Sequence, residues 1–305
     1  MILTVTLNAA LDVTYRVPAL RPHGSHRVTE ATARAGGKGV NVARVLARMG
    51  RTTLVTGLVG GAAGATVRAD LAAAGLPDAL LPIAGETRRT VAVVDRLAAD
   101  ATMFNEPGPA VTAGEWSSFT DHFGALLERA EVVVLAGSLP PGLPDDAYAT
   151  LVRAARGRGV PVLLDTSAPW LLPALAAGPD LVKPNADELR EATGLAEPHR
   201  AAAALLDRGA GAVVASLGPD GLLATTPDGS WLATPPERLA GNPTGAGDSA
   251  VAALTTGLLD SLPWPARLAR AVALSAATVL APTAGDYDPA AYHHLLPRVT
   301  VTALG

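Results

Sequence analysis

The chain has 305 residues, of which 49% are apolar, so it is long enough for one large α/β domain or two smaller ones with a sizeable core. The formal net charge of −4, and the lack of any basic run longer than a pair, argue against nucleic acid as a partner. Because the sequence contains no cysteine, it excludes disulfides, thiolate metal sites and cysteine nucleophiles, and a reducing cytoplasm is the expected location.

Short apolar runs alternate with helical patterns along the chain. The first run, 2–7, follows no basic leader and is expected to be a strand rather than a signal peptide. Five more strands are expected, at 52–59, 131–137, 161–165, 180–184 and 211–218. Helices are expected between them and after them, at 38–49, 63–74, 112–129, 144–157, 186–193, 199–208, 247–260 and 264–281, with a hairpin at 221–233.

This alternation predicts an α/β fold with a mostly parallel central sheet and helices on both faces. Ligands of such a sheet bind beyond the carboxyl ends of its strands. The longest uncharged run, 52–67, is too short and too rich in glycine to span a bilayer, so no membrane partner is expected.

Two segments interrupt the α/β rhythm, at about 8–35 and 86–106. Both alternate polar and apolar residues without a helical pattern, as exposed antiparallel strands do. Together they predict a small antiparallel sheet that forms a lid over the ligand edge. With no repeat and no clear linker, the simplest division is a single domain over 1–305.

Lysine is rare in this sequence. Of 24 basic residues only Lys38 and Lys183 are lysines, and both lie in motifs marked by glycine or proline, "AGGKGVN" and "VKPNADE". An ammonium is a compact point charge that suits a tight phosphate site, where a guanidinium is no equal substitute. The alternative is that two residues fall in such motifs by chance.

The segment "AGGKGVNVARVLARMG" opens a helix with glycines. Gly37 and its neighbours allow backbone amides to approach a ligand, and Lys38 can reach an anion there. Asn41 lies three residues further on and shares the helix face of Lys38. The segment is not a P-loop, because no Ser or Thr follows Lys38. A glycine turn with a solvated lysine is the structural alternative.

Polar residues also follow two of the expected strands. In "AGSLPPG", Ser138 comes at a strand end, where it either meets a ligand or belongs to a proline turn. In "DLVKPNADEL", Asn185 and Glu188 have the spacing of a capping box, and they equally offer oxygens to Mg²⁺, directly or through water.

The segment "SLGPDG" supplies Ser216, Gly218 and Gly221 at the end of another strand. A β-turn built on its proline, aspartate and glycine is one interpretation. The other is a set of backbone contacts to a nucleotide.

The segment "GNPTGAGDSA" places Asp248 directly after Gly245, Ala246 and Gly247, at the start of a helix. Three amides converging at the positive helix end would suit a phosphoryl group that gains charge in a transition state. Asp248 would accept the proton of a substrate hydroxyl. Stabilisation of the helix by an acidic first-turn residue explains Asp248 but not the three small residues before it.

The lid segments carry a further polar set. It contains Asp12, Arg88, Arg89 and Asn105, and only one of the two adjacent arginines can face a given site. Ordinary exposed polarity is the alternative for each of them.

In this order the motifs closely resemble the ribokinase-like (pfkB) carbohydrate kinases, from Leu7 to about Gly285. The two family signatures correspond to "GGKGVNVA" and "TGAGDS". "LNAALD", "TRRTVAVVD", "NEPGP", "GSLPPG", "KPNADEL" and "SLGPDG" are most similar to its hexose-phosphate branch. The sequence departs from the family at Ala9, where a proline is usual, and at "NPT" before the second signature.

The resemblance implies a ribokinase-like fold and transfer of the γ-phosphoryl of Mg·ATP to a sugar-phosphate hydroxyl, with fructose 1-phosphate as the expected acceptor. Tagatose 6-phosphate and fructose 6-phosphate stay open. A kinase of an unphosphorylated sugar or nucleoside would leave Lys38 and Arg88 without a partner. A dehydrogenase or nucleotide-binding regulator is disfavoured, because no G-x-G-x-x-G follows the first strand.

The resemblance also implies roles for single residues and a homodimer that pairs through the lid. Asp248 would be the base, and Gly245, Ala246 and Gly247 the anion hole. The sugar hydroxyls would be held by Asp12, Gly37 and Asn41, and the substrate's phosphate or neighbouring oxygens by Lys38, Arg88, Asn105 and Ser138. ATP would be held by Lys183, Asn185, Ser216, Gly218 and Gly221. Asn185 and Glu188 would act on Mg²⁺, and we expect this contact to run through water.

Overall fold

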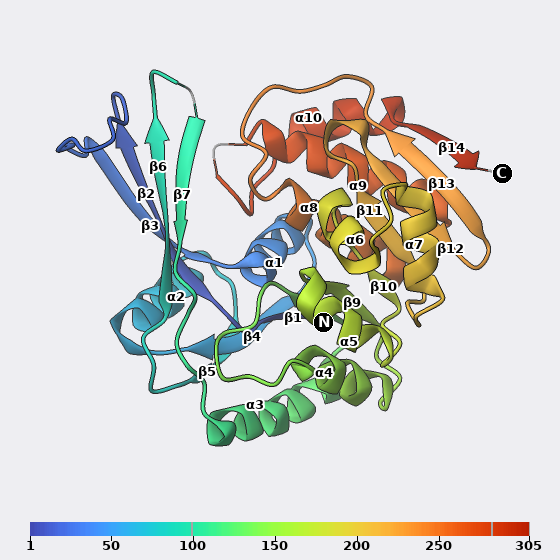
Figure 1. Cartoon of the computed structure of the whole chain (residues 1–305), viewed down its shortest axis with the longest axis horizontal. Coiled ribbons are helices and arrows are strands. Elements are labelled where there is room, and N and C mark those ends of the chain that lie inside the picture. Colours follow the sequence, from blue (N-terminus) through green and yellow to red (C-terminus); the bar gives the residue numbers. More distant parts are fainter. Residues whose placement is uncertain (99, 282, 305) are drawn as a thin grey trace.

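The computed structural model describes residues 1–98, 100–281 and 283–304. Its main feature is a ten-stranded sheet in the order β14-β13-β12-β11-β10-β9-β8-β1-β4-β5 (Figure 1). Seven neighbouring strands of this sheet run parallel: β11, β10, β9, β8, β1, β4 and β5. The strands β12, β13 and β14 extend the sheet antiparallel. The strands are β1 (Ile2–Thr6), β4 (Thr53–Val59), β5 (Asp78–Pro82), β8 (Val132–Ala136), β9 (Val162–Asp165), β10 (Leu181–Val182), β11 (Val213–Ser216), β12 (Leu222–Thr226), β13 (Gly229–Thr234) and β14 (Thr300–Leu304).

Helices cover both faces of this sheet, as expected. Successive strand residues point to opposite faces, so Val133 and Leu135 join one hydrophobic cluster while Val132 and Val134 join the other. The first cluster lies under α3 (Ala113–Leu126), α4 (Ala147–Arg156), α5 (Ala168–Leu175), α6 (Ala186–Thr193) and α7 (Pro198–Leu206). The second lies under α1 (Lys38–Arg48), α8 (Ala246–Leu259), α9 (Trp264–Val279) and α10 (Pro289–Leu295).

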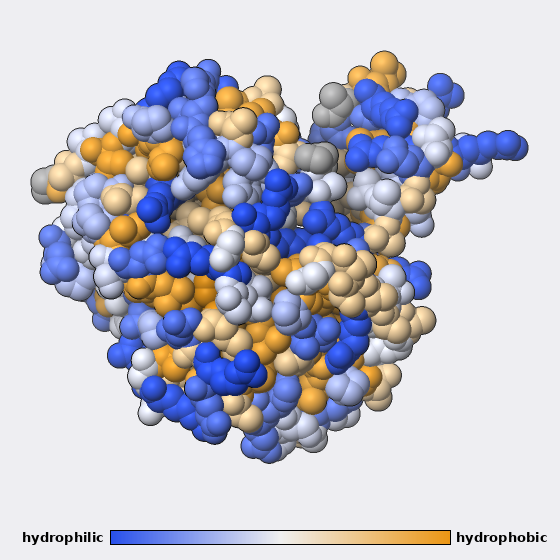
Figure 2. All heavy atoms as spheres, turned by 180° about the vertical axis from the view of Figure 1, so that it is seen from behind, coloured by the Kyte–Doolittle hydropathy of each residue, from blue (hydrophilic) through white to orange (hydrophobic). Residues whose placement is uncertain are grey.

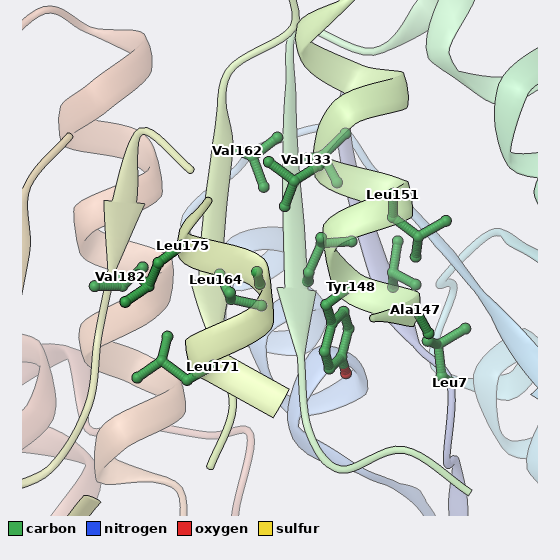
Figure 3. Packing of buried hydrophobic residues seen from close by; sticks show 14 of the residues in the cluster. Leu7, Val133, Ala147, Tyr148, Leu151, Val162, Leu164, Leu171, Leu175 and Val182 are labelled. Carbon is green, nitrogen blue, oxygen red and sulfur yellow. The ribbon is translucent and has the colours of Figure 1, made fainter. Parts of the chain in front are cut away.

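The packing of the first cluster is tight around Tyr148. Its ring lies among Leu7, Leu151 and Leu164 (Figure 3), and its hydroxyl donates to the carbonyl of Gly137 at 2.9 Å. This bond satisfies the one polar atom of a fully buried side chain and fixes the strand end that carries Ser138.

A third cluster joins the lid to the body. It contains α2 (Gly61–Ala73) and parts of α1 and β4. Short 3₁₀ turns at Leu127–Arg129, Gly218–Asp220 and Leu296–Arg298 complete the described elements. No helix within residues 1–98, 100–281 and 283–304 has both the length and the apolar character that a membrane crossing requires.

The lid is a separate four-stranded sheet in the order β3-β2-β6-β7. Its strands are β2 (Ala10–Val17), β3 (Glu30–Gly36), β6 (Arg88–Asp95) and β7 (Asp100–Asn105). The outer pairs are antiparallel, as expected, but β2 and β6 run parallel. The reason is that β2 follows β1 and β6 follows β5, and these two strands of the main sheet point in the same direction.

Every strand and helix expected from the sequence is present, with shifted ends. Four elements were not expected: β5, α5, α10 and β14. Each is short, and β14 is a largely exposed edge strand without the apolar run that marked the others.

Candidate active site

The polar residues gather where the parallel strands end, beneath the lid. Figure 2 shows the lid from behind as a projection, with a notch between it and the body. Asp165 is the last residue of β9, Lys183 follows β10, and Lys38 begins α1. The Nζ atoms of Lys38 and Lys183 lie 3.2 Å and 3.5 Å from the same oxygen of Asp165, Oδ1. The two lysines of the sequence therefore meet at one buried carboxylate.

The charges of this trio support one another. Burial alone would raise the pKa of Asp165, but Lys183 and Lys38 hold it below its ordinary value. Burial alone would lower the pKa of Lys38, but the carboxylates of Asp165, Asp248 and Glu188 raise it above its ordinary value. Asp165 and Lys38 therefore both carry charge at neutral pH. The second oxygen of Asp165, Oδ2, is buried and has no hydrogen-bond partner among the described residues.

Asp248 occupies the first turn of α8 and is 7% exposed. Its Oδ2 accepts a hydrogen bond of 2.8 Å from Nδ2 of Asn41. Burial raises the pKa of Asp248 to about 6, although the nearby charge of Lys38 opposes this. A carboxylate with this pKa is ionised at neutral pH and more basic than an exposed one, which suits a general base.

The three small residues before Asp248 lie at the mouth of α8. Gly245 is the N-cap with φ of 87°, which favours glycine. The amide of Ala246 donates to the carbonyl of Pro243 at 3.1 Å, so one of the three expected amides is already engaged. The amide of Gly247 has no acceptor within the described ranges. A Cβ on Gly247 would lie 3.7 Å from Nζ of Lys183, so this ammonium stands beside the helix mouth.

A hollow of about 660 Å³ opens on one side of the mouth of α8. Four residues expected at a nucleotide site line this hollow, together with Ala246 and Gly247: Asn185, Ser216, Gly218 and Gly221. Apolar side chains from α8 and α9 form another wall: Ala250, Val272, Ala276 and Val279. Its size and mostly apolar lining are typical of a site for a small organic ligand.

Asn185 and Glu188 form the capping box that their spacing predicted. Oδ1 of Asn185 accepts from the amide of Glu188, and Oε2 of Glu188 accepts from the amide of Asn185, both at 2.8 Å. The structural interpretation of this motif is confirmed. One oxygen of Glu188 is not used by the box.

Asp12 faces the cleft from the lid strand β2. Burial raises its pKa to about 6, opposed by Arg88, by a hydrogen bond with Thr90 and by the charges of Arg34 and Arg44. Gly36 lies beneath it, and a Cβ there would come within 2.0 Å of Oδ2 of Asp12. Gly37 follows with φ of 103° as the N-cap of α1. Gly36 therefore leaves room for the lid carboxylate, and Gly37 supplies the left-handed backbone with which the helix starts.

Arg88 and Ser138 are fixed by one asparagine, Asn8. Nε of Arg88 donates to the carbonyl of Asn8 and its Nη1 to the carbonyl of Glu106, both at 3.1 Å. Nδ2 of Asn8 donates to Oγ of Ser138 at 3.1 Å. Asn105 lies opposite Thr90 on β7, hence on the lid face of Asp12, but it is exposed and contacts none of the other expected residues by a hydrogen bond.

Three residues of this cluster were not expected from the sequence. Asp165 holds both lysines, Asn8 holds Arg88 and Ser138, and Arg34 reaches from the lid to the loop beside Gly245. Asp165 had a signal, because an aspartate that ends the apolar run "PVLLD" lies at the ligand edge of a parallel sheet. Arg34 had none, since its partners are 249 and 250 residues away.

The chain is similar over most of its length to known carbohydrate kinases. A family model for pfkB family carbohydrate kinases matches residues 4–291. The 1-phosphofructokinase of Rhodobacter capsulatus is 41% identical over 291 residues, and the match covers 92% of each chain. The 1-phosphofructokinase of Xanthomonas campestris pv. campestris is 39% identical over 284 residues, covering 89% of each.

Solved structures share the fold. Phosphofructokinase-2 from Escherichia coli in complex with potassium has a TM-score of 0.91 at 30% identity, covering 97% of this chain and 98% of that chain. A possible 1-phosphofructokinase from Thermotoga maritima has a TM-score of 0.90 at 26% identity, covering all of both chains. The ribokinase-like fold, the phosphotransferase class and the resemblance inferred from the motifs are confirmed, and the chain belongs to the pfkB family of carbohydrate kinases.

Proposed function

We propose that this kinase transfers the γ-phosphoryl of Mg·ATP to the free primary hydroxyl of fructose 1-phosphate, which gives fructose 1,6-bisphosphate and ADP. The observation that carries the proposal is the position of Asp248. It combines a pKa of about 6 with a place at the mouth of α8, next to two lysines and a nucleotide-sized hollow. Two curated relatives at 41% and 39% identity are named for the same activity.

In the proposed reaction Asp248 accepts the proton of the substrate hydroxyl. The oxygen then forms its bond to the γ-phosphorus while the bond to the β-γ bridging oxygen breaks, and the electron pair leaves with ADP. Lys38, Lys183 and the helix mouth are positioned to compensate the charge on the moving group. The amide of Gly247 is available there, whereas the amide of Ala246 has to leave the carbonyl of Pro243 first.

The donor set fits Mg²⁺. Asp165 has a buried oxygen without a partner, and Glu188 has one oxygen outside the capping box. We assign Asp165, Asn185 and Glu188 to the ion, the last two through water. Mg²⁺ at nucleotide sites usually takes one or two carboxylates and keeps several waters, which these donors can provide. The ion would supply positive charge to the β- and γ-phosphates.

The lid side of the cleft is assigned to the acceptor. We assign Asp12, Asn41 and the backbone at Gly37 to the sugar hydroxyls, and Arg88, Asn105 and Ser138 to the substrate's own phosphate. Lys38 lies between Asp165 and Asp248. We therefore assign it to the phosphoryl group that is transferred, instead of to the substrate's own phosphate. Lys183, Asn185, Ser216, Gly218 and Gly221 are assigned to ATP.

Fructose 6-phosphate is the second candidate acceptor, because a solved structure of the E. coli phosphofructokinase-2 at 30% identity is a complex with that compound. The test is ADP release by the purified protein with Mg·ATP and each of fructose 1-phosphate, fructose 6-phosphate, tagatose 6-phosphate and fructose. We expect the highest kcat/KM with fructose 1-phosphate. A higher value with unphosphorylated fructose would overturn the assignment of Arg88 to a phosphate.

We also propose a cytoplasmic homodimer that pairs through the lid. β7 is exposed over its full length and is an edge strand of the lid, and it carries Met103 and Phe104, which are 45% and 58% exposed. Exposed apolar groups on an edge strand favour association. One E. coli phosphofructokinase-2 structure is tetrameric. Light scattering on Phe104→Glu, with exposed Leu172→Glu on the body as control, should show a monomer for the lid variant only.

A further inference from the structure

Arg34 connects the lid to a loop of the body. It lies on β3 directly opposite Asp12 of β2. Its Nη1 nevertheless donates to Oγ1 of Thr283 at 2.7 Å and to the carbonyl of Ala284 at 3.2 Å. Both acceptors are uncharged and lie in the loop that follows α9. The guanidinium thus bridges two parts of the molecule rather than pairing with the carboxylate beside it.

The other side of this loop supports the catalytic turn. A Cβ on Gly245 would lie 3.0 Å from Cα of Ala284, so Ala284 fills the space behind the N-cap of α8. A Cβ on Gly285 would lie 3.2 Å from Oδ1 of Asn41, the residue that holds Asp248. The loop therefore contacts both the turn before the proposed base and the side chain that orients it.

The remaining supports of the loop lie further along the chain. Asp286 forms an ion pair with Arg48, and the ring of Tyr287 lies under the same guanidinium at 5.2 Å. Among the described residues, Arg34 is the one side chain that donates hydrogen bonds to Thr283 and Ala284. Its position also has an electrostatic cost, because burial and the charge of Arg44 lower the pKa of Arg34.

We infer that Arg34 is a positioning residue for phosphoryl transfer, which acts by fixing Thr283 and Ala284 against Gly245 and Asn41. The inference rests on the proposed roles of Gly245 and Asp248. Charge-assisted bonds to a hydroxyl and a carbonyl are strong enough to hold a short loop in one place. Because reacting groups tolerate little displacement, a loosened loop lowers turnover without removing any contact to substrate.

The first experiment is steady-state kinetics on Arg34→Met with the sugar phosphate varied and then ATP varied. We expect kcat to fall about 10- to 100-fold, as for a misplacement of about 1 Å, with little change in either KM. Thr283→Val removes the loop partner and leaves every lid residue unchanged, so it should lower kcat in the same direction. Arg34→Lys keeps the charge and one donor direction, and should restore part of the activity.

The second experiment separates positioning from general destabilisation. In Arg34→Met combined with Thr283→Val, the two losses of kcat should not add, because both single changes break the same contact. Arg16→Met is the matched control: it removes an equal charge from the same face of the lid, where its partner is Glu30. We expect the control to keep its kcat.

The third measurement does not depend on the substrate. Amide hydrogen exchange of the unliganded protein should become faster at both 283–288 and 241–248 in Arg34→Met and unchanged at both in Arg16→Met. Faster exchange at 283–288 alone would overturn the inference, as would a raised sugar-phosphate KM with unchanged kcat, which would make Arg34 a substrate ligand. A failure of the proposed function would give a different result. Asp248→Asn would then keep its turnover, while the exchange rates would still change in Arg34→Met as expected.

Discussion

The two sides of the cleft are built differently. The nucleotide side is a hollow between α8, α9 and the ends of β11 and β12, with walls of small apolar side chains that are packed against the main core. The acceptor side is made mainly of charged and polar groups on lid strands, joined by Asn41 and Ser138 from the body. One of the lid strands, β7, is exposed from end to end. The first side is held by the packing of the main core. The second is open along β7, which in our proposal a second subunit covers.

This difference separates binding from chemistry. Asp248, Asp165 and the two lysines lie on the body, where buried contacts fix them. Asp12, Arg88 and Asn105 lie on the lid. Changes on the body should therefore act on kcat or on folding, and changes on the lid should act on the KM of the sugar phosphate. The following predictions break or sharpen that division.

The largest effect is expected for Asp248→Asn. Loss of the general base should lower kcat by about 10²- to 10⁴-fold, and both KM values should change little, because an amide keeps the shape and can accept from Asn41. Coupled measurement of ADP release gives both parameters. Asp121→Asn, at an exposed position of α3 outside the hollow, is the control. Near-normal turnover of Asp248→Asn would remove Asp248 from the mechanism.

The same variant should be more stable than the parent at neutral pH. The pKa of Asp248 is raised to about 6 in the folded protein, so ionisation opposes folding once the pH exceeds the unfolded value near 4. The penalty grows between pH 4 and pH 6 and is complete above it. Asn cannot ionise, so Asp248→Asn should gain about 3 kcal/mol at pH 7.5 and nothing below pH 4, measured by urea unfolding. An unchanged difference across this range would contradict the burial argument.

Asp165→Ala should damage the body most. It leaves Lys38 and the buried Lys183 without their shared carboxylate, and breaking a buried ion pair costs about 3–5 kcal/mol, less here because Lys38 is partly exposed. Urea unfolding at constant pH measures the loss. Asp180→Ala, which removes an aspartate in a more exposed pair with Arg156, should cost much less. Equal losses in the two variants would mean that the trio contributes no special stability.

Arg88→Ala should act on the acceptor alone. A charged hydrogen bond contributes about 1.5–3 kcal/mol, so the KM of the sugar phosphate should rise about 10-fold or more while the KM of ATP stays constant. Arg89→Ala, one residue away on the exposed side of the strand, is the matched control. If the KM of ATP rises instead, the two phosphate sites have been assigned the wrong way round.

The smallest effect is expected for the pH dependence of kcat/KM in the unchanged protein. Asp12 and Asp248 both have pKa values raised to about 6, and both are expected to act as carboxylates. The kcat/KM for the sugar phosphate should therefore fall as the pH drops from 7 through 6 to 5. In Asp12→Asn one of the two ionisations is removed, so the fall should become less steep. An unaltered profile would show that Asp12 binds the sugar equally well in both protonation states.

The sequence predicted the body of the fold because its strands are buried on both faces and form unbroken apolar runs. The direction of β2 against β6 could not be predicted, since it depends on how β1 and β5 point in the main sheet. The motif at the start of α8 made Asp248 a candidate for the base, because helix capping alone does not explain three small residues directly before the aspartate. Asp165 could not be singled out because it is the last residue of an apolar strand. Arg34 could not be singled out because its partners are distant in the chain and uncharged.

The meeting of both lysines at Asp165 has a practical consequence. Apart from the terminal amine, an amine-directed reagent has no target on this protein outside the cleft, because every other basic side chain of the lysine and arginine class is a guanidinium. Acylation of the folded protein would therefore label the terminal amine quickly and Lys38 slowly, because the neighbouring carboxylates keep the Lys38 ammonium protonated, and a bound nucleotide would slow the labelling of Lys38 further. A reagent that modifies most proteins all over their surface would here report on ligand occupancy.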